Sequence, residues 1–330
     1  MTVLPLVAVG SFGGTIAMAR EVGGAGLTPE KGADELLAAI PELAQLARTV
    51  AHQVCNVGSP SVRLDDVVAG VEWAREQVDS GADGVVFTHG TDTLEETAFL
   101  VDLLWDREAP IVVTGAMRSP EEPGADGPAN LVGAVLTACS RQARGLGVLV
   151  VINDQVFRGD RIRKAHTFAM DAFRDQWNPQ IGRITEGMLE VDYLPASPRP
   201  APLPLGAARH RVAVVGTGIG DEGESFAAVV ADGVGALVID GVGAGHVSAQ
   251  AAEVVGELVE RVPVVMASRI RGGRAGRTTY AYRGAEVDLI NRGVIMAGRL
   301  NAAQARLLAW VLLSTGAEVK EWRRQFELRG

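Results

Sequence analysis

Short runs of Val, Ile and Leu, separated by longer amphipathic stretches, most constrain how this chain of 330 residues folds. In the first half these apolar runs are continuous, which is typical of strands buried on both faces of a parallel sheet. A helical pattern follows most runs, so the order indicates right-handed βαβ units with helices on both faces. We expect strands at 3–10, 49–57, 84–88, 110–114 and 146–152, and helices at 31–40, 64–80, 93–106 and 129–141.

A proline-rich segment, Tyr193–Ala208, divides the chain and holds five of its 15 prolines. Proline stiffens the backbone and removes its hydrogen-bond donor, so this segment is expected to be a semi-rigid linker. A second α/β pattern follows, with strands at 212–215, 236–239 and 262–267 and helices at 225–231, 249–260, 301–313 and 318–329. We predict a two-domain α/β fold with a larger parallel-sheet domain at 1–192, a linker at 193–208 and a smaller domain at 209–330.

The charge balance and the cysteines narrow the class of protein. With 31 Lys and Arg against 40 Asp and Glu, the formal charge of −9 argues against a nucleic-acid-binding protein, which usually carries a basic surface. The two cysteines, Cys55 and Cys139, form no disulfide framework and fit a reducing compartment. No apolar run reaches the roughly 18 residues that cross a bilayer. We expect a cytoplasmic protein that binds neither nucleic acid nor membrane.

Two of the predicted strands end in glycine-rich turns that carry hydroxyl side chains. The first turn, SFGGTIA, contains Thr15, and the second, THGTDT, contains Thr91. Because ligands of an open parallel sheet bind beyond the carboxyl ends of its strands, we expect both threonines to border one cleft. Gly13 and Gly14 allow the backbone to approach a ligand closely and to offer N–H groups to a developing oxyanion.

A threonine hydroxyl is a weak nucleophile until a neighbouring base removes its proton. Asp92 follows Thr91 directly, and Lys164 comes after the last strand expected in this domain and a loop expected at 153–160. A desolvated lysine amine is able to serve as the base. Together with Thr15, these residues indicate acyl transfer on a small polar substrate. The alternative that the sequence leaves open is structural, with both turns only connecting strand to helix and Asp92 as an N-cap.

Neither a nucleotide site nor a metal site is expected. Residues 216–221, GTGIGD, follow a predicted strand as a dinucleotide-binding turn does, but Asp221 replaces the third glycine and would repel a pyrophosphate. The five histidines are scattered, without the close spacing of metal ligands and without cysteine partners. We therefore expect no cofactor.

Four longer stretches carry a resemblance to a known family: SFGGTIA at 11–17, FTHGTDTLEETAFLVDLL at 87–104, VVTGAMRSP at 112–120 and VINDQVFRGDRIRK at 151–164. With them the chain resembles the bacterial-type L-asparaginase (asparaginase–glutaminase) family over nearly its whole length. The resemblance implies hydrolysis of the side-chain amide of asparagine to aspartate and ammonia, without metal or organic cofactor. It also implies a homo-oligomer, a dimer or tetramer, in which the C-terminal domain of one chain completes the active site of a neighbour.

The resemblance assigns catalytic roles to four residues. Thr15 matches the nucleophilic threonine of the family. Thr91, Asp92 and Lys164 match its second catalytic group, in which the lysine and the aspartate polarise the second threonine.

The resemblance also implies a site for the two charged groups of an amino acid. Ser59 matches a serine that binds the α-carboxylate, and Asp92 matches the acid that holds the α-amino group. Ala116 matches a residue whose backbone carbonyl receives the substrate amide, and Gly14 brings the backbone up to the substrate. Glu286 resembles an acidic residue that a neighbouring subunit contributes. Fixed spacing between an anion site and a cation site gives specificity for the amino-acid head.

One family residue is missing from the sequence. The family places a tyrosine about ten residues beyond the nucleophile, on a mobile loop, where it activates that threonine. The corresponding segment here, Met18–Pro29, contains three glycines and no tyrosine, and the chain's tyrosines are Tyr193, Tyr280 and Tyr282. His246 stands where an asparagine of the neighbouring subunit often lies.

Two interpretations of the mechanism follow from the missing tyrosine. The chemistry persists through Thr15 or Thr91 with Lys164 as base, at a lower rate or with altered substrate choice. Alternatively, Tyr280 or Tyr282 of a neighbouring chain supplies the hydroxyl. As other functions, the sequence leaves open a glutaminase or another small-amide hydrolase of the same fold, and a weakly active amino-acid-binding or sensory protein.

Overall fold

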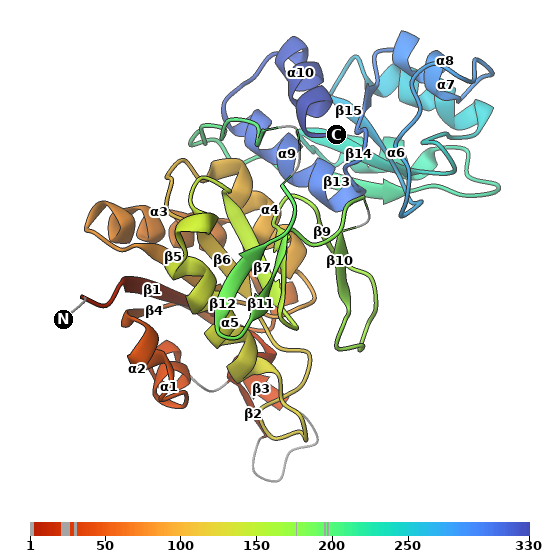
Figure 1. Cartoon of the computed structure of the whole chain (residues 1–330). Coiled ribbons are helices and arrows are strands. Elements are labelled where there is room, and N and C mark those ends of the chain that lie inside the picture. Colours follow the sequence, from red (N-terminus) through yellow and green to blue (C-terminus); the bar gives the residue numbers. More distant parts are fainter. Residues whose placement is uncertain (1–2, 21–26, 30–31, 176, 195, 197) are drawn as a thin grey trace. The chain divides into compact units, whose positions relative to one another are not determined.

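The computed structural model describes residues 3–20, 27–29, 32–175, 177–194, 196 and 198–330. The chain forms two compact units, Met1–Pro202 and Leu203–Gly330, and each has its own sheet with parallel strands and helices (Figure 1). The predicted two-domain α/β fold is thereby confirmed. Within the described residues, none of the helices has the length and apolar character that a membrane crossing requires.

The first unit is built on an eight-stranded sheet. Its strands are β1 (Leu6–Gly13), β4 (Arg48–Val57), β5 (Gly84–Thr88), β6 (Ile111–Thr114), β7 (Val148–Ile152), β8 (Gln155–Arg158), β11 (Gly182–Thr185) and β12 (Met188–Val191). They stand side by side in the order β12-β11-β8-β7-β6-β5-β1-β4. The five strands from β7 to β4 run parallel, as the continuous apolar runs predict.

The other three strands extend this sheet in antiparallel fashion. Because β8 lies within residues 153–160, the expectation of a loop there is wrong. Asn153 and Asp154 have positive φ angles of 52° and 57°, the conformation of a two-residue hairpin turn between β7 and β8. Glu186 and Gly187, with φ angles of 49° and 74°, form the equivalent turn between β11 and β12.

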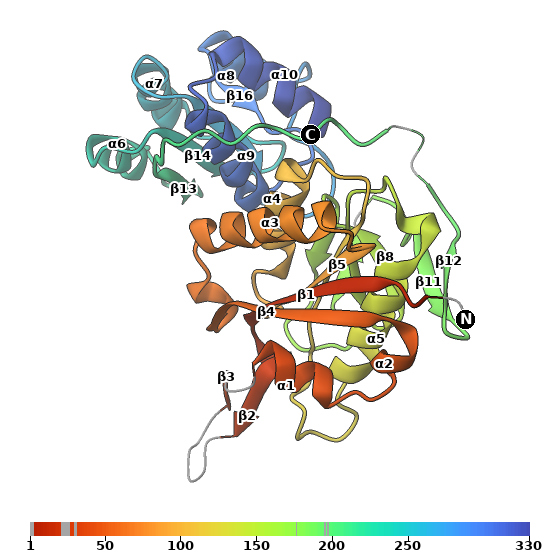
Figure 2. The same ribbon diagram turned by 90° about the vertical axis from the view of Figure 1, so that its left-hand side faces the viewer.

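Helices cover both faces of the parallel strands, in line with the predicted βαβ units (Figure 2). They are α1 (Ala33–Ala38), α2 (Leu43–Leu46), α3 (Leu64–Asp79), α4 (Leu94–Leu104) and α5 (Gly127–Cys139). α3 and α4 lie on one face, whereas α5, α1 and α2 lie on the other. On the α5 face, Val9, Val86 and Val112 of three neighbouring strands are fully buried in one core with Leu131.

Two small antiparallel ribbons complete the first unit. One pairs β2 (Met18–Arg20) with β3 (Leu27–Pro29), and the other pairs β9 (Ile162–Lys164) with β10 (Phe173–Asp175). Residues 21–26 of the segment that was expected to be a mobile loop lie outside the described residues.

The second unit has a four-stranded parallel sheet. Its strands, in sheet order, are β13 (Val212–Gly216), β14 (Ala236–Gly241), β15 (Val264–Ser268) and β16 (Ile295–Met296). Its helices are α6 (Glu224–Ala231), α7 (Ala249–Leu258), α8 (Glu286–Asn291), α9 (Ala302–Ser314) and α10 (Val319–Arg329). The sequence did not predict β16 and α8, because two and six residues are too few to show a hydrophobic period.

The proline-rich segment is anchored to each unit in turn. Arg199 Nε donates to the buried Asp102 Oδ1 of α4 at 2.8 Å, and Gly206 N donates to Ser314 Oγ of α9 at 2.9 Å. The division between the units falls between these two anchors. The exact ends of the linker at 193–208 stay a prediction.

Candidate active site

β1 ends in the turn that carries Thr15. Gly13 and Gly14 have positive φ angles of 87° and 90°, which favour glycine. A Cβ atom on Gly14 would lie 2.3 Å from the backbone nitrogen of Gly90, so the turns after β1 and β5 touch through their backbones. Thr15 and Thr91 each follow one of these touching glycines, and the contact therefore brings both threonines to the same edge of the sheet.

Buried hydroxyl groups join the ends of β1 and β5. Gly13 N donates to Ser11 Oγ at 3.2 Å, and Thr88 Oγ1 donates to the same oxygen at 3.0 Å. Ser11 and Thr88 are both fully buried. The N–H group of Gly13 is thus engaged within the protein, which leaves Gly14 as the glycine of the pair that fits the expected oxyanion donor.

His89 holds the turn after β5 from inside. It is fully buried, with Nδ1 2.8 Å from the carbonyl oxygen of Gly90 and Nε2 2.9 Å from Thr97 Oγ1. A carbonyl only accepts, so Nδ1 carries the proton and Nε2 accepts from the threonine. Burial lowers the pKa of His89 to about 4, against the opposing effect of the hydrogen bond to Gly90. The neutral ring therefore fixes the turn after β5.

Lys164, the last residue of β9, reaches this turn with its side chain. Its Nζ atom donates to Thr91 Oγ1 at 3.0 Å and to Asp92 Oδ1 at 2.6 Å. Thr91 is buried and the lysine side chain is 15% exposed, whereas that of Asp92 is 66% exposed. The backbone nitrogen of Lys164 donates to Glu95 Oε2 at 2.5 Å, which ties β9 to the first turn of α4. The structure therefore brings together three of the four predicted catalytic residues through direct hydrogen bonds.

This arrangement has a chemical consequence for Thr91. An ammonium group that donates to Thr91 Oγ1 stabilises negative charge on that oxygen, and a neutral amine in the same place accepts the hydroxyl proton. Asp92 compensates the positive charge of the lysine in either step. The contact suits a threonine hydroxyl that passes a proton on. The N-cap of α4 is Thr93, so the alternative with Asp92 as the N-cap is wrong.

Ser59 lies beside the same turn. It opens a short 3-10 helix after β4 (Ser59–Ser61) and is 4% exposed. Thr93 Oγ1 donates to the Ser59 carbonyl at 2.9 Å. A Cβ atom on Gly90 would lie 2.9 Å from Ser59 Oγ, so the serine hydroxyl sits against the backbone that precedes Thr91.

The loop after β6 carries Ala116 and is held by two residues that the sequence did not single out. Asn130 Nδ2 donates to the Gly115 carbonyl at 2.9 Å, and the carboxylate of Asp126 accepts from the backbone nitrogen of Met117 at 2.9 Å. A Cβ atom on Gly115 would lie 2.5 Å from the His89 carbonyl oxygen. The loop therefore packs directly against the turn of Thr91. Asp126 and Asn130 lie in the stretch GADGPANL, residues 124–131.

Glu286 lies in the second unit and is fully buried there. Its Oε1 atom accepts from the backbone nitrogens of Thr279 and Tyr280, both at 2.7 Å, and its Oε2 atom contacts His246 Nε2 at 2.7 Å. Burial opposes its ionisation, but these hydrogen bonds outweigh burial and hold its pKa below the usual value. Within its own unit the carboxylate is already satisfied.

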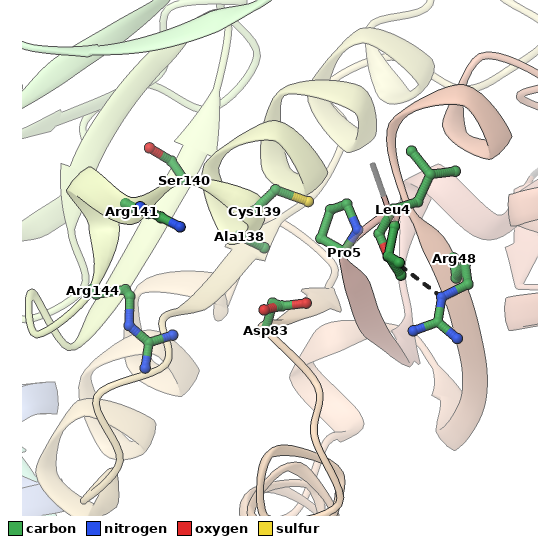
Figure 3. Close-up of a pocket in the computed structure, with 10 residues that line it drawn as sticks. Leu4, Pro5, Arg48, Asp83, Ala138, Cys139, Ser140, Arg141 and Arg144 are labelled. Carbon is green, nitrogen blue, oxygen red and sulfur yellow. Dashed lines mark hydrogen bonds between the residues drawn. The ribbon is translucent and has the colours of Figure 1, made fainter. Parts of the chain in front are cut away.

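A surface pocket of about 600 Å³ lies at the amino ends of the parallel strands in the first unit, opposite the threonine turns (Figure 3). Its lining includes Pro5 before β1, Asp83 before β5 and Cys139 at the end of α5. Burial raises the pKa of the Cys139 thiol to about 11, with Asp83 adding to the effect, so the thiol is un-ionised at neutral pH. The pocket is separate from the threonine turns, which lie at the carboxyl ends of the strands.

Among the described residues, no group of three or more His, Cys, Asp or Glu side chains is arranged to hold a metal ion. The turns described above contain hydroxyl, amine and carboxylate groups in hydrogen-bonding contact, which suits acid–base and nucleophilic chemistry on a polar substrate.

The chain matches the family model of the asparaginase N-terminal domain over residues 6–197 and that of the glutaminase/asparaginase C-terminal domain over residues 211–326. A probable L-asparaginase of Deinococcus radiodurans is 38% identical over 98% of this chain and 97% of its own length. The glutaminase-asparaginase of Pseudomonas fluorescens biotype A is 32% identical over 98% of this chain and 91% of its own length.

A solved structure gives the same result at the level of the fold. The crystal structure of a probable cytoplasmic L-asparaginase from Campylobacter jejuni matches with a TM-score of 0.87 and 28% sequence identity. The match covers 98% of this chain and 99% of that one. The similarity therefore extends over both units.

Proposed function

The chain belongs to the asparaginase–glutaminase family, as its motifs predict, and is an amidohydrolase; on that premise we propose that it hydrolyses the side-chain amide of L-asparagine to L-aspartate and ammonia. The observation that carries the proposal is the pair of hydrogen bonds from Lys164 Nζ to Thr91 Oγ1 and Asp92 Oδ1, next to the turn of Thr15. No metal or organic cofactor enters the reaction.

Thr15 is the proposed nucleophile. Its Oγ atom adds to the amide carbon while its proton passes to a base, and the carbonyl electron pair moves onto the oxygen. The backbone N–H of Gly14, in the turn that precedes Thr15, is the proposed hydrogen-bond donor to this oxyanion. As the intermediate collapses, the base returns its proton to the nitrogen and the C–N bond breaks, which releases ammonia and leaves an aspartyl ester on Thr15.

Thr91, Lys164 and Asp92 are proposed to act on the water that breaks this ester. Neutral Lys164 takes the hydroxyl proton of Thr91, Thr91 takes a proton from water, and the hydroxide formed attacks the ester carbon. Thr15 Oγ leaves with a proton, which restores the enzyme. The distances of 3.0 Å and 2.6 Å around Lys164 Nζ fit this proton path, since transfer needs hydrogen-bond contact.

The charged head of the substrate is proposed to lie between Ser59 and Asp92. The hydroxyl of Ser59 donates to the α-carboxylate, and the exposed carboxylate of Asp92 receives the α-ammonium group. The backbone carbonyl of Ala116 accepts an N–H of the substrate amide, and Gly14 lets the main chain come close. This proposal is supported by the packing of the loops of Ser59 and Ala116 against the Thr91 turn.

The proposal includes a homo-oligomer with shared sites. In this oligomer the C-terminal unit of one copy completes the active site of another copy. Glu286 is one of the residues that this unit contributes. We also propose a cytoplasmic location, in accord with the description of the Campylobacter jejuni protein.

Ammonia release from L-Asn, D-Asn, L-Gln and simple amides tests the function. We expect turnover of L-Asn, and a loss of about 10²-fold or more in kcat for Thr15→Ala. Full activity of both Thr15→Ala and Thr91→Ala would sink the assignment. Preferred turnover of L-Gln would make the chain a glutaminase, a reading that the name of the Pseudomonas fluorescens relative favours. Calorimetric binding of L-Asn without ammonia would instead identify an amino-acid-binding protein.

A further inference from the structure

A chain of hydrogen bonds in the second unit links an exposed phenol to a buried carboxylate. Tyr282 Oη lies 2.8 Å from His246 Nδ1, and His246 Nε2 lies 2.7 Å from Glu286 Oε2. The exposed fraction is 57% for Tyr282, 7% for His246 and 0% for Glu286. The three residues thus form a relay that runs from the surface of the unit into its interior.

The position of each proton in the relay follows from its partners. Glu286 Oε1 accepts two backbone N–H groups, from Thr279 and Tyr280, so the carboxylate is held in its ionised form. Oε2 is then an acceptor, and His246 Nε2 carries the proton that it receives. In a neutral imidazole the other nitrogen is an acceptor. The hydroxyl of Tyr282 therefore donates its proton to His246 Nδ1.

The local backbone is shaped around these side chains. Gly276 leaves room for Glu286, because a Cβ atom there would lie 3.0 Å from the carboxyl carbon. Gly284 has a φ angle of 83°, and a Cβ atom on it would lie 2.3 Å from the Val247 carbonyl oxygen. The Tyr280 ring contacts the His246 ring edge-on, with the ring centres 5.6 Å apart. The imidazole is consequently fixed in orientation.

We propose that Tyr282, with His246 and Glu286 behind it, is the acid–base group that takes the proton of Thr15 in the active site of a second copy of this chain. The inference rests on the proposed function and names a residue for its unassigned base. Tyr282 is the catalytic residue in this assignment. His246 stores the proton, and Glu286 is a positioning residue that supports the substrate site without touching the substrate.

The proton path balances in both directions. When Thr15 Oγ bonds to the amide carbon, its proton moves to Tyr282 Oη and the tyrosine proton moves to His246 Nδ1. The imidazolium formed is stabilised by the ionised Glu286, as in a Ser-His-Asp triad. When the C–N bond breaks, the proton returns through Tyr282 to the leaving nitrogen, which departs as ammonia.

Two observations favour this donor over the first unit's own groups. Lys164 is engaged with Thr91 and Asp92, and the segment after Thr15 in sequence, Met18–Pro29, has no tyrosine. The Tyr282 side chain is exposed while its proton acceptor His246 is buried, so its ring is accessible to a partner outside its own unit.

Kinetics of matched tyrosine variants give the first test. Tyr282→Phe is expected to lower kcat by about 10²-fold with little change in KM. Tyr280→Phe is the control, because its ring contacts the same histidine while its described hydrogen bonds use only the backbone. In mixtures of light and heavy water, a curved dependence of kcat on deuterium content is expected for the wild type and a linear one for His246→Gln. Unchanged kcat in Tyr282→Phe overturns the inference and leaves the proposed function standing.

Mixed oligomers test whether the base comes from a second copy. Thr15→Ala and Tyr282→Phe chains are co-expressed, and mixed assembly is verified by native mass spectrometry. If Tyr282 serves another copy, one site in the mixed assembly is intact and activity returns. If it serves its own chain, every site in the mixture lacks one of the two residues. Absence of rescue in a verified mixed assembly therefore overturns the assignment to a second copy.

Histidine ring NMR tests the relay without turnover. With ¹⁵N-labelled histidine, we expect a protonated Nε2 and an unprotonated Nδ1 in His246, and a shift of the Nδ1 signal in Tyr282→Phe. The reverse tautomer contradicts the relay. Because this measurement needs no asparagine hydrolysis, it separates a failure of the relay from a failure of the proposed function.

Discussion

Replacement of Lys164 by methionine removes the group on which the proposed mechanism depends. The variant keeps the length and the apolar stem of the side chain, but it loses the donors to Thr91 Oγ1 at 3.0 Å and Asp92 Oδ1 at 2.6 Å. The stability cost is small, because the Asp92 side chain is 66% exposed and such an ion pair contributes about 0–1 kcal/mol. The hydrogen bond to Thr91 adds about 1 kcal/mol.

The expected loss of rate is larger than this loss of stability. General acid–base groups contribute about 10²–10⁴-fold, which corresponds to about 3–5 kcal/mol of activation free energy. Lys164→Met is therefore expected to stay folded and to lose at least about 10²-fold in kcat for asparagine, measured as ammonia release. Circular dichroism and thermal unfolding monitor the fold.

Arg161→Met is the matched control for this variant. Arg161 lies three residues before Lys164 in the sequence, and its side chain pairs with Asp160 at 3.3 Å. Its replacement removes one positive charge from the region and is expected to leave kcat unchanged. A Lys164→Met protein that is folded and retains wild-type kcat would refute the assigned role of the lysine, as would an equal loss in both variants.

Three further predictions concern the scaffold of the site. Gly14→Ala is expected to lower the free energy of unfolding by more than the control Gly81→Ala, because the added Cβ atom would lie 2.3 Å from Gly90 N whereas the space around Gly81, with a φ angle of 102°, is open. Denaturant titration should give a loss of about 1–2 kcal/mol for the control, and equal losses in both variants would contradict the contact. The pKa of His89 is about 4 in the folded protein and 6.5 in its ordinary state, so between these pH values the unfolded chain binds more protons than the folded one. The free energy of unfolding should therefore fall by about 3 kcal/mol as the pH drops through this window, and then level off. His89→Gln should flatten that slope in pH-dependent unfolding, and an unchanged slope would show that another group causes it. Asn130→Ala removes a buried hydrogen bond that holds the loop after β6, and a stability loss of about 2 kcal/mol with a reduced kcat is expected; wild-type values for both would disprove its positioning role.

The parallel core was predictable because its strands are buried on both faces and leave uninterrupted apolar runs. The antiparallel edge was not, since β8, β11 and β12 have four residues each and show no clear period. A turn signal was nevertheless present in Asn153-Asp154, because asparagine and aspartate tolerate the positive φ angles of a two-residue hairpin. This dipeptide therefore marks the turn that precedes β8.

The site was predictable as a set of turns but not as a set of contacts. Because ligands bind beyond the carboxyl ends of parallel strands, we expected the turns of Thr15 and Thr91 at one edge of the sheet. The touching backbones of Gly14 and Gly90 agree with that expectation. The sequence indicated Lys164 as a base for this cleft, and the resemblance grouped it with Thr91 and Asp92. Its hydrogen bond to Thr91 spans 73 positions, so the contact itself depends on the fold.

The Tyr282–His246–Glu286 relay illustrates the limit more clearly. Its two hydrogen bonds join residues 36 and 40 positions apart. The resemblance matched His246 to a residue of the neighbouring subunit, but nothing local to Tyr282 or Glu286 indicated that the three side chains are hydrogen-bonded to one another. A partnership of this kind depends on how β14 and α8 are placed in the folded unit, which residue spacing alone does not encode.

Identification of the covalent intermediate tests the central claim most directly. The enzyme is mixed with L-asparagine, quenched in acid within the first turnovers, digested and analysed by peptide mass spectrometry. The account predicts an aspartyl ester on the peptide that contains Thr15, and its accumulation in the Lys164→Met variant, in which water attack is slowed. An ester on the peptide that contains Thr91, or ammonia release without any ester in that variant, would contradict the assignment of Thr15 as the nucleophile.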